Sequence, residues 1–261
     1  MADNKRDTYN RMAGRVVVVA GASSGIGRAT ALRLGAEGAY LIVGSPAAER
    51  PQIDSLVEEI DSFGGIAVGA AFDATDDASV RALVQFAVDR FGGIDAFHAN
   101  FADLRVIMQD SNAVAVSDEI LERTLDVNLK GMLRATRAAV PALVARGGGA
   151  MIYTSSTASR AGEPERPCYA MAKAGVNALV RHVASRWGKQ NVRANAVMPG
   201  FVLVPEKPIP DEFARITLDQ TRAVRLGRPE DIAAMVALLA SDDGAWVNGQ
   251  AIAVDGGATL G

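Results

Sequence analysis

The sequence predicts an α/β fold in which a parallel sheet of seven strands is covered by helices on both faces. Three observations predict this class. Short apolar runs alternate along the chain with segments of helical periodicity, which is typical of strand–helix–strand units. The chain has 261 residues, 49% of them hydrophobic, which is enough for one large core. No linker, repeat or low-complexity tract interrupts it, so we expect a single domain.

The strand candidates are short and rich in β-branched or small apolar residues. They are the segments 16–20, 40–43, 66–71, 94–99, 150–154, 192–197 and 251–254. A helical pattern follows the first strand through Leu34 and stops at Gly38. Between the third and fourth strands, apolar residues follow the spacing of an amphipathic helix: Val80, Leu83, Val84, Ala87, Val88 and Phe91. Pro229 opens a later helix at a position that suits proline.

The least regular segment spans residues 203–225. It carries Pro205, Pro208 and Pro210 among many charges. It directly follows a turn of the kind that lines a site, which favours a mobile flap over a ligand. The alternative is a long surface connection.

Composition excludes several classes of function. A formal net charge of −3 without a basic stripe argues against nucleic-acid binding. Apolar stretches are too short to span a bilayer, and the first twelve residues lack the apolar core of a secretory signal. We therefore expect a cytoplasmic protein. A single cysteine and two histidines leave no disulfide framework and little for a metal site.

A glycine-rich turn joins the first strand to its helix in the run G-A-S-S-G-I-G. Gly21, Gly25 and Gly27 allow a tight turn that a phosphate can approach closely. The helix that follows presents unpaired N–H groups to an anion, and Ser23 and Ser24 add hydroxyls. The position in a strand–turn–helix unit favours dinucleotide binding over an ordinary turn.

Tyr169 and Lys173 are four residues apart in P-C-Y-A-M-A-K. On a helix this spacing places both side chains on one face. An ammonium group there favours the phenolate and is expected to lower the tyrosine pKa, which suits proton exchange with a carbonyl or an alcohol. Alone, such a pair is usually a surface accident, so the interpretation depends on the accompanying motifs.

Taken together, these motifs resemble the short-chain dehydrogenase/reductase family, whose nucleotide loop has the spacing G-x-x-x-G-x-G. The resemblance runs from about Gly14 to Gly261, leaving residues 1–13 as an N-terminal extension. Further matches are F-D-A-T-D with Asp73, H-A-N-F-A at residues 98–102, L-D-V-N-L-K-G with Asn128, Y-T-S-S-T-A-S with Ser156, M-P-G-F-V and A-V-D-G-G. The resemblance implies a Rossmann-type, doubly wound sheet that binds a nicotinamide dinucleotide.

The family implies a catalytic tetrad of Asn128, Ser156, Tyr169 and Lys173. Tyr169 would be the general acid, and Ser156 would donate to the substrate oxygen as its charge grows. Lys173 would lower the tyrosine pKa and bind the nicotinamide ribose. Asn128 would hold a water that links Lys173 to solvent.

The other implied contacts fall into two groups. Cofactor contacts, besides Tyr169 and Lys173, are Gly21, Ser23, Ser24, Gly25, Ile26, Gly27, Ser45, Asp73, Ala74, Asn100, Phe101, Ala102, Val127, Pro199, Gly200 and Val202. Substrate contacts are Phe101, Ser156, Arg160, Cys168, Tyr169 and Phe201, with Ser159 beside them.

Two departures from the family pattern affect the expected site. Phe101 places a bulky ring near the nicotinamide ribose, where it could narrow the substrate pocket. Ser45 stands where an acidic residue would bind the ribose of NAD. With no carboxylate before Glu49, and with Arg50 or Arg28 as possible phosphate partners, the sequence favours NADP over NAD.

The leading hypothesis is an oxidoreductase that interconverts a carbonyl and a secondary alcohol on a small organic substrate. A second is a dinucleotide-sensing binding protein that has lost the chemistry, although it would usually lack the tyrosine or the lysine. A third is imine, epimerase or dehydratase-like chemistry on the same cofactor. The resemblance also implies a homotetramer, or a homodimer. His98 is expected to be a core residue and His182 a surface residue.

Overall fold

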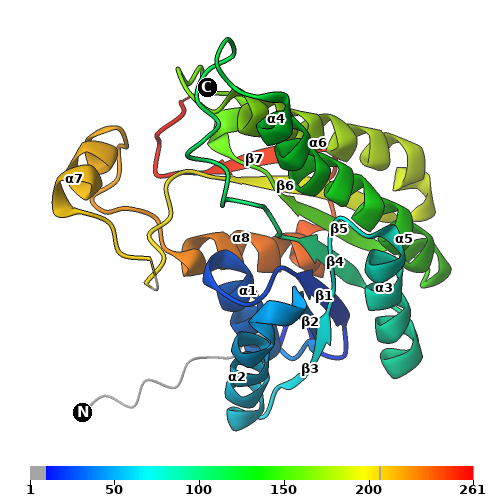
Figure 1. The fold of residues 1–261 in the computed structure, drawn as a ribbon. Helices are drawn as coiled ribbons and strands as arrows, with labels where there is room; N and C mark the ends of the chain where they lie inside the picture. The colour runs from blue at the N-terminus through cyan, green and yellow to red at the C-terminus, as the bar shows by residue number, and fades with distance from the viewer. Residues whose placement is uncertain (1–9, 206, 261) are drawn as a thin grey trace, which may run out of the picture.

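A single seven-stranded parallel sheet forms the centre of the protein (Figure 1). The computed structural model describes residues 10–205 and 207–260. The strand order is β3-β2-β1-β4-β5-β6-β7. The strands are β1 (Val16–Ala20), β2 (Tyr40–Ser45), β3 (Ile66–Ala71), β4 (Ala96–Ala99), β5 (Gly149–Thr154), β6 (Val192–Pro199) and β7 (Ala251–Val254). The expected fold class is confirmed, including the single Rossmann-like domain.

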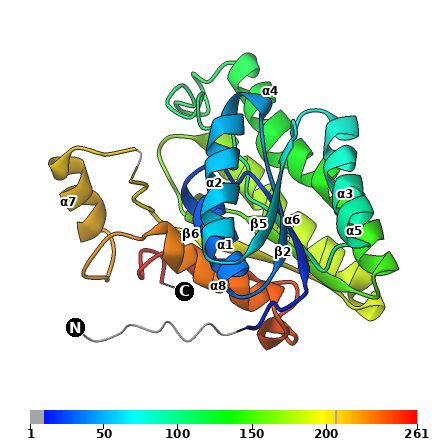
Figure 2. The ribbon, with the colours of Figure 1, turned by 90° about the horizontal axis from the view of Figure 1, so that it is seen from below.

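Helices cover both faces of the sheet (Figures 1 and 2). α1, α2 and α8 pack on one face, and α3, α5 and α6 pack on the other, each over its own hydrophobic cluster. The helices are α1 (Gly25–Ala36), α2 (Arg50–Ser62), α3 (Asp77–Phe91), α4 (Asp118–Leu125), α5 (Gly131–Ala145), α6 (Pro167–Trp187), α7 (Asp211–Asp219) and α8 (Pro229–Ala240). Because both faces are covered, the central strands are almost wholly buried and can be apolar along their length.

The strand order reverses between β1 and β4, which lie side by side at the middle of the sheet. The chain builds β1 to β3 outward on one side and β4 to β7 outward on the other. The loops that leave the carboxyl ends of β1 and β4 therefore diverge. In open α/β sheets, ligands bind in the crevice at this point.

Element boundaries differ from the sequence prediction by a few residues. β2 and β6 each continue two residues further, and β4 begins at Ala96 instead of residue 94. The larger difference is in the segment 203–225, where α7 forms. It stands away from the main body in Figures 1 and 2. The prolines of the segment precede this helix without interrupting it, and Pro210 lies directly before its first residue.

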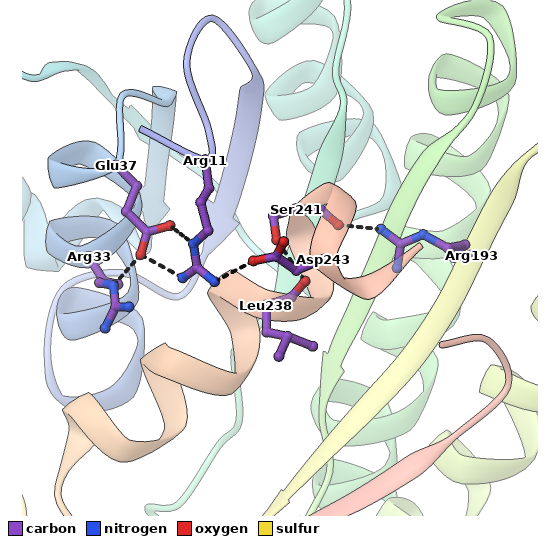
Figure 3. Close-up of polar contacts among 7 residues, drawn as sticks. All are labelled: Arg11, Arg33, Glu37, Arg193, Leu238, Ser241 and Asp243. Atoms are coloured by element: carbon purple, nitrogen blue, oxygen red, sulfur yellow. Dashed lines mark hydrogen bonds and ion pairs between the residues drawn. The ribbon is translucent and has the colours of Figure 1, made fainter. Parts of the chain in front are cut away.

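The described part of the N-terminal segment packs onto the domain (Figure 3). The Met12 side chain is fully buried. Arg11 donates to Glu37 at the end of α1 and to Asp243 after α8, and Arg33 also pairs with Glu37. Glu37 has only 4% of its side chain exposed, so these two guanidinium groups are its main polar partners. Most of the expected extension, residues 1–9, lies outside the described residues.

We expect Glu37→Ala to lower the free energy of unfolding by about 1–3 kcal/mol, because the substitution leaves Arg11 and Arg33 without their shared buried acceptor. Urea denaturation near neutral pH measures this. Asp54→Ala is the matched control, since it breaks the exposed Arg50–Asp54 pair on α2, and such pairs contribute less than about 1 kcal/mol. Equal losses in the two variants would contradict the structural role given to Glu37.

Candidate active site

A large cleft lies at the carboxyl ends of the strands. Its volume is about 1650 Å³, above the roughly 300–1,000 Å³ of most small-molecule sites, so it has room for a dinucleotide and a substrate together. It brings together most of the residues predicted as site residues. Those that line it are Gly21, Ser23, Ser24, Gly25, Ile26, Asp73, Ala74, Asn100, Phe101, Ala102, Val127, Ser156, Tyr169, Lys173, Pro199, Gly200, Phe201 and Val202.

The glycine-rich turn is held by close backbone packing. Gly21 has φ +92°, and a Cβ on it would lie 2.9 Å from the backbone of Asn100 at the end of β4. A Cβ on Gly27 would lie 1.9 Å from the Gly21 carbonyl oxygen. Gly27 therefore lies behind the turn and shapes it without lining the cleft. Asn100 Nδ2 donates to the same Gly21 oxygen at 2.9 Å, which ties the turn to β4.

Ser45 supports this turn through its side chain. Its side chain is buried, and its Oγ accepts hydrogen bonds from the backbone N–H groups of Ala22 and Ser23 at 3.2 and 3.1 Å. The side chain does not line the cleft. The end of β2 thus packs the Ser45 hydroxyl against the turn, and the expected cofactor contact at Ser45 stays a prediction.

Glu49 is one of the cleft residues that the sequence prediction missed. It lies in the short 3₁₀ turn after β2, lines the cleft and accepts a hydrogen bond from Ser23 Oγ at 2.5 Å. Neither of the two expected phosphate partners lines the cleft. Arg28 pairs with Glu59, and Arg50 pairs with Asp54. The sequence did carry a signal for Glu49, since it is the first acidic residue after β2, four positions after Ser45.

Tyr169, Ser156 and Lys173 converge at the other end of the cleft. Burial raises the pKa of Tyr169, while Ser156 and the Arg166 guanidinium act to lower it. The lowering of the Tyr169 pKa that the sequence predicts from Lys173 does not outweigh the effect of burial. Lys173 Nζ donates to the carbonyl oxygen of Thr154 at 2.8 Å and lies 5.7 Å from the centre of the Tyr169 ring. Burial also lowers the pKa of Lys173 itself to about 8.

Thr154 connects Lys173 to the glycine-rich turn. Its carbonyl oxygen accepts from Lys173, and its hydroxyl donates to Asn100 Oδ1 at 2.8 Å. His98 Nε2 lies 2.9 Å from the same hydroxyl. Because the single hydroxyl hydrogen goes to Asn100, Nε2 is the donor. The His98 side chain is fully buried, as expected of a core residue, and its Nδ1 has no hydrogen-bond partner among the described residues.

Asn128 lies in a π-helical turn, Asp126–Lys130, between α4 and α5. Its side chain is fully buried and does not line the cleft. Oδ1 accepts from the backbone N–H of Asp103 at 2.8 Å. Nδ2 has no hydrogen-bond partner among the described residues, so a donor remains available in this position. Widened helical turns of this kind are frequent at functional sites.

The Phe101 ring packs against the core at a position that also lines the cleft. It lies edge-on to Phe72, with ring centres 5.6 Å apart, and only 8% of the residue is exposed. A Cβ on Gly131 would lie 2.9 Å from the Phe101 ring. Glycine at the start of α5 therefore provides the space that the ring fills. Phe101 still lines the cleft, and its expected contact with substrate stays a prediction.

Three other expected substrate contacts point elsewhere. Cys168 is fully buried, and burial is the main reason that the pKa of its thiol is raised to about 11. Arg160 is exposed, and its guanidinium donates to the carbonyl oxygen of Ala251. Ser159 Oγ donates to the Ser156 carbonyl oxygen and accepts from Asn177. None of the three lines the cleft.

The segment after β6 forms the remaining wall. Phe201, Val204 and Lys207 line the cleft. The Phe201 ring contacts Phe213 on α7 edge-on, with ring centres 5.5 Å apart. A Cβ on Gly25 would lie 3.3 Å from the Val204 side chain, so this segment reaches across to the glycine-rich turn. The position suits a flap, which stays a prediction.

None of the helices that the structure describes has both the length and the apolar composition needed to cross a bilayer. Residues 10–205 and 207–260 contain no group of three or more His, Cys, Asp or Glu side chains placed to hold a metal ion.

The chain belongs to the short-chain dehydrogenase/reductase family. The family model described as enoyl-(acyl carrier protein) reductase matches residues 21–259. A 3-oxoacyl-(acyl-carrier-protein) reductase of Thermotoga maritima is 33% identical, over 96% of this chain and 100% of the relative. A cyclohexanol dehydrogenase of Acinetobacter sp. is 34% identical, over 96% and 97%. The solved structure of a 7α-hydroxysteroid dehydrogenase complexed with NADH and 7-oxo glycochenodeoxycholic acid has a TM-score of 0.88 at 28% identity, covering 96% of both chains.

The buried His98 predicts a loss of stability in acid. Burial lowers its pKa from 6.5 to about 3, so the unfolded chain binds more protons than the folded chain between these values. The stability of the folded chain that depends on a neutral His98 is therefore fully present above about pH 6.5 and is lost as the pH falls toward 3. We expect His98→Val to lose less stability than the wild type between about pH 7 and pH 5, measured by urea denaturation.

His182→Val is the control for this prediction, because His182 is the exposed histidine on α6. It is expected to keep the wild-type decline. An identical decline in His98→Val and in the wild type would contradict a neutral buried His98.

Proposed function

We propose that this protein is a nicotinamide-dependent oxidoreductase that interconverts a carbonyl and a secondary alcohol on a small organic substrate. The observation that carries the proposal is the convergence of Tyr169, Ser156 and Lys173 in one cleft with the glycine-rich turn. The turn offers the backbone N–H groups of a helix start to a diphosphate. The Tyr169 end offers a proton donor beside a hydroxyl, as reduction of a carbonyl requires.

The cleft fits a dinucleotide on two observations. Close packing at Gly21 and Gly27, where a Cβ would clash with backbone, holds the glycine-rich turn tight at the edge of the cleft. Asp73 and Ala74 line the opposite end, where an adenine would lie. A nicotinamide group bound near Tyr169 would supply or accept the hydride.

The residues at the reacting end have separable roles. Tyr169 gives its proton to the substrate oxygen in reduction and takes it back in oxidation. Ser156 donates a hydrogen bond to the same oxygen as negative charge develops. Lys173, held by the Thr154 carbonyl oxygen, contributes positive charge and binds ribose hydroxyls. The Nδ2 group of Asn128 is the donor that would hold a water behind Lys173.

The substrate class follows from what the relatives share. Their names describe reduction of a 3-oxoacyl group and dehydrogenation of a hydroxysteroid and of cyclohexanol. Each reaction interconverts a ketone and a secondary alcohol, although the carbon skeletons of the substrates differ. We infer the same reacting group here. Phe201, Leu104 and Ile107 give the cleft an apolar component, which suits an organic carbonyl of small or medium size.

The side-chain contacts in the structure favour a different cofactor from the one that the sequence favours. The sequence favoured NADP because Ser45 replaces an acidic residue, with Arg28 or Arg50 as phosphate partners. Both arginines are paired with acids outside the cleft. Glu49 lines the cleft beside Ser23, where its carboxylate would repel a 2′-phosphate and accept from ribose hydroxyls. We therefore propose NAD as the preferred cofactor.

The two alternative functions have less support. A dinucleotide-sensing protein without chemistry would not need a proton donor, a hydroxyl and a buried lysine at one end of the cleft. Imine, epimerase or dehydratase-like chemistry would need a Phe101 ring that reshapes the pocket, whereas this ring packs edge-on against Phe72 and only 8% of the residue is exposed. Association into a homotetramer or homodimer stays a proposal. Partly exposed apolar side chains on α5 and α6, such as Leu133 and Met171, favour it.

Tyr169→Phe is expected to lower kcat by roughly 10²- to 10⁴-fold, the contribution of a general acid, while cofactor affinity persists. The measurement is NADH and NADPH consumption against cyclic and acyclic ketones, a steroid ketone and a 3-oxoacyl thioester, with cofactor binding followed by fluorescence. Tyr40→Phe is the control, since Tyr40 lies on β2 away from the cleft. Cofactor binding without turnover in the wild type would favour the sensing function, and full activity in Tyr169→Phe would refute Tyr169 as the acid.

Wild-type kcat/KM is expected to be higher with NAD(H) than with NADP(H). Glu49→Gln should narrow this ratio by about tenfold or more, since removing one charge repulsion of roughly 1.4 kcal/mol changes an equilibrium tenfold. Glu58→Gln on the exposed face of α2 controls for net charge and should leave the ratio unchanged. A wild-type preference for NADP(H), or a ratio unaltered in Glu49→Gln, would overturn the assignment.

A further inference from the structure

The helix that carries Tyr169 begins without a capping side chain of its own. Arg166 occupies the position before the first helical residue, in the left-handed conformation with φ 66° and ψ 45°. This conformation is unfavourable for a residue other than glycine, and the Arg166 side chain makes no capping hydrogen bond. The first N–H groups of α6 therefore need acceptors from elsewhere in the chain.

Asp110 supplies these acceptors from the segment between β4 and α4. Its Oδ1 accepts from the Cys168 N–H at 3.2 Å, and its Oδ2 accepts from the Tyr169 N–H at 2.8 Å. Its backbone carbonyl oxygen accepts from the Arg166 N–H at 2.8 Å. Asp110 is almost fully buried, with 1% exposed. The negative carboxylate at a helix N-terminus is also favourable for the helix dipole.

The same segment reaches the cleft and the π-helical turn. Leu104, Arg105 and Ile107 line the cleft a few residues before Asp110. Asp103, at the beginning of the segment, donates its N–H to Asn128 Oδ1. The segment is thus fixed at one end to Asn128 and at the other to the backbone of Tyr169. A displacement of Asp110 would move the catalytic helix start relative to the residues that face the ligand.

We propose that Asp110 is a positioning residue, which holds the backbone of Tyr169 so that the phenol stays in line with Ser156 and Lys173. The proposal rests on the proposed function, in which Tyr169 is the proton donor. A purely structural cap would stabilise α6 without affecting turnover. A positioning residue affects kcat more than it affects cofactor affinity, because misplacement of a reacting group by about 1 Å can cost 100-fold in rate.

The test compares Asp110→Ala, Asp110→Asn and Ser117→Ala. Asp110→Ala is expected to lower kcat about 10- to 100-fold with little change in the KM for the cofactor, since the glycine-rich turn is untouched. Asp110→Asn keeps one acceptor oxygen and should recover part of the loss. Ser117 caps α4 at the far end of the same segment, accepting from the Ile120 N–H, so Ser117→Ala removes a cap without touching α6 and should keep kcat.

Amide hydrogen exchange gives a second readout that does not need turnover. In Asp110→Ala, exchange at Cys168 and Tyr169 should accelerate, while the interior of α6 keeps its protection. If the wild type reduces no carbonyl, the proposed function fails, and this exchange pattern still decides whether Asp110 holds the helix start. An unchanged kcat in Asp110→Ala, an equal loss in Ser117→Ala, or unchanged exchange at Tyr169 would each overturn the proposal.

Discussion

Close backbone packing between the turn after β1 and the end of β4 is the constraint on which the site depends. Gly21 touches the Asn100 backbone, and Gly27 touches the Gly21 carbonyl oxygen, at distances that no side chain would allow. Asn100 then fixes the turn with a side-chain hydrogen bond. Because β1 and β4 flank the point where strand order reverses, this contact sets the position of the turn against all later loops.

Thr154 links this packed turn to the end of the cleft that carries Tyr169 and Lys173. One residue at the end of β5 holds Asn100 through its hydroxyl and Lys173 through its carbonyl oxygen. The glycine-rich turn and α6 are thereby both held against the end of β5. Burial keeps His98 neutral beside it and lowers the pKa of Lys173 to about 8. In such a weakly hydrated region, a charge acts more strongly on its neighbours than it would in water.

Much of this arrangement could be predicted from the sequence because its signals are local. Strand and helix periodicity depends on residues within one turn or one pleat, so the seven strands and the helix at Pro229 were predicted within a few residues. Parallel strands end at the same edge of the sheet. Motifs that follow β1, β3, β4, β5 and β6 must therefore meet there, and Gly21, Asp73, Asn100, Ser156 and Pro199 do line one cleft.

By itself, the sequence determined the fold class, the family and the edge of the sheet that carries the site. Only the tertiary structure decided which neighbour each side chain meets. Ser45 faces the turn while Glu49 faces the cleft, and Cys168 is buried. Asp110 meets Tyr169 across 59 residues. The physical reason is that side-chain direction at a loop depends on packing between elements distant in the chain, which neither spacing nor periodicity encodes.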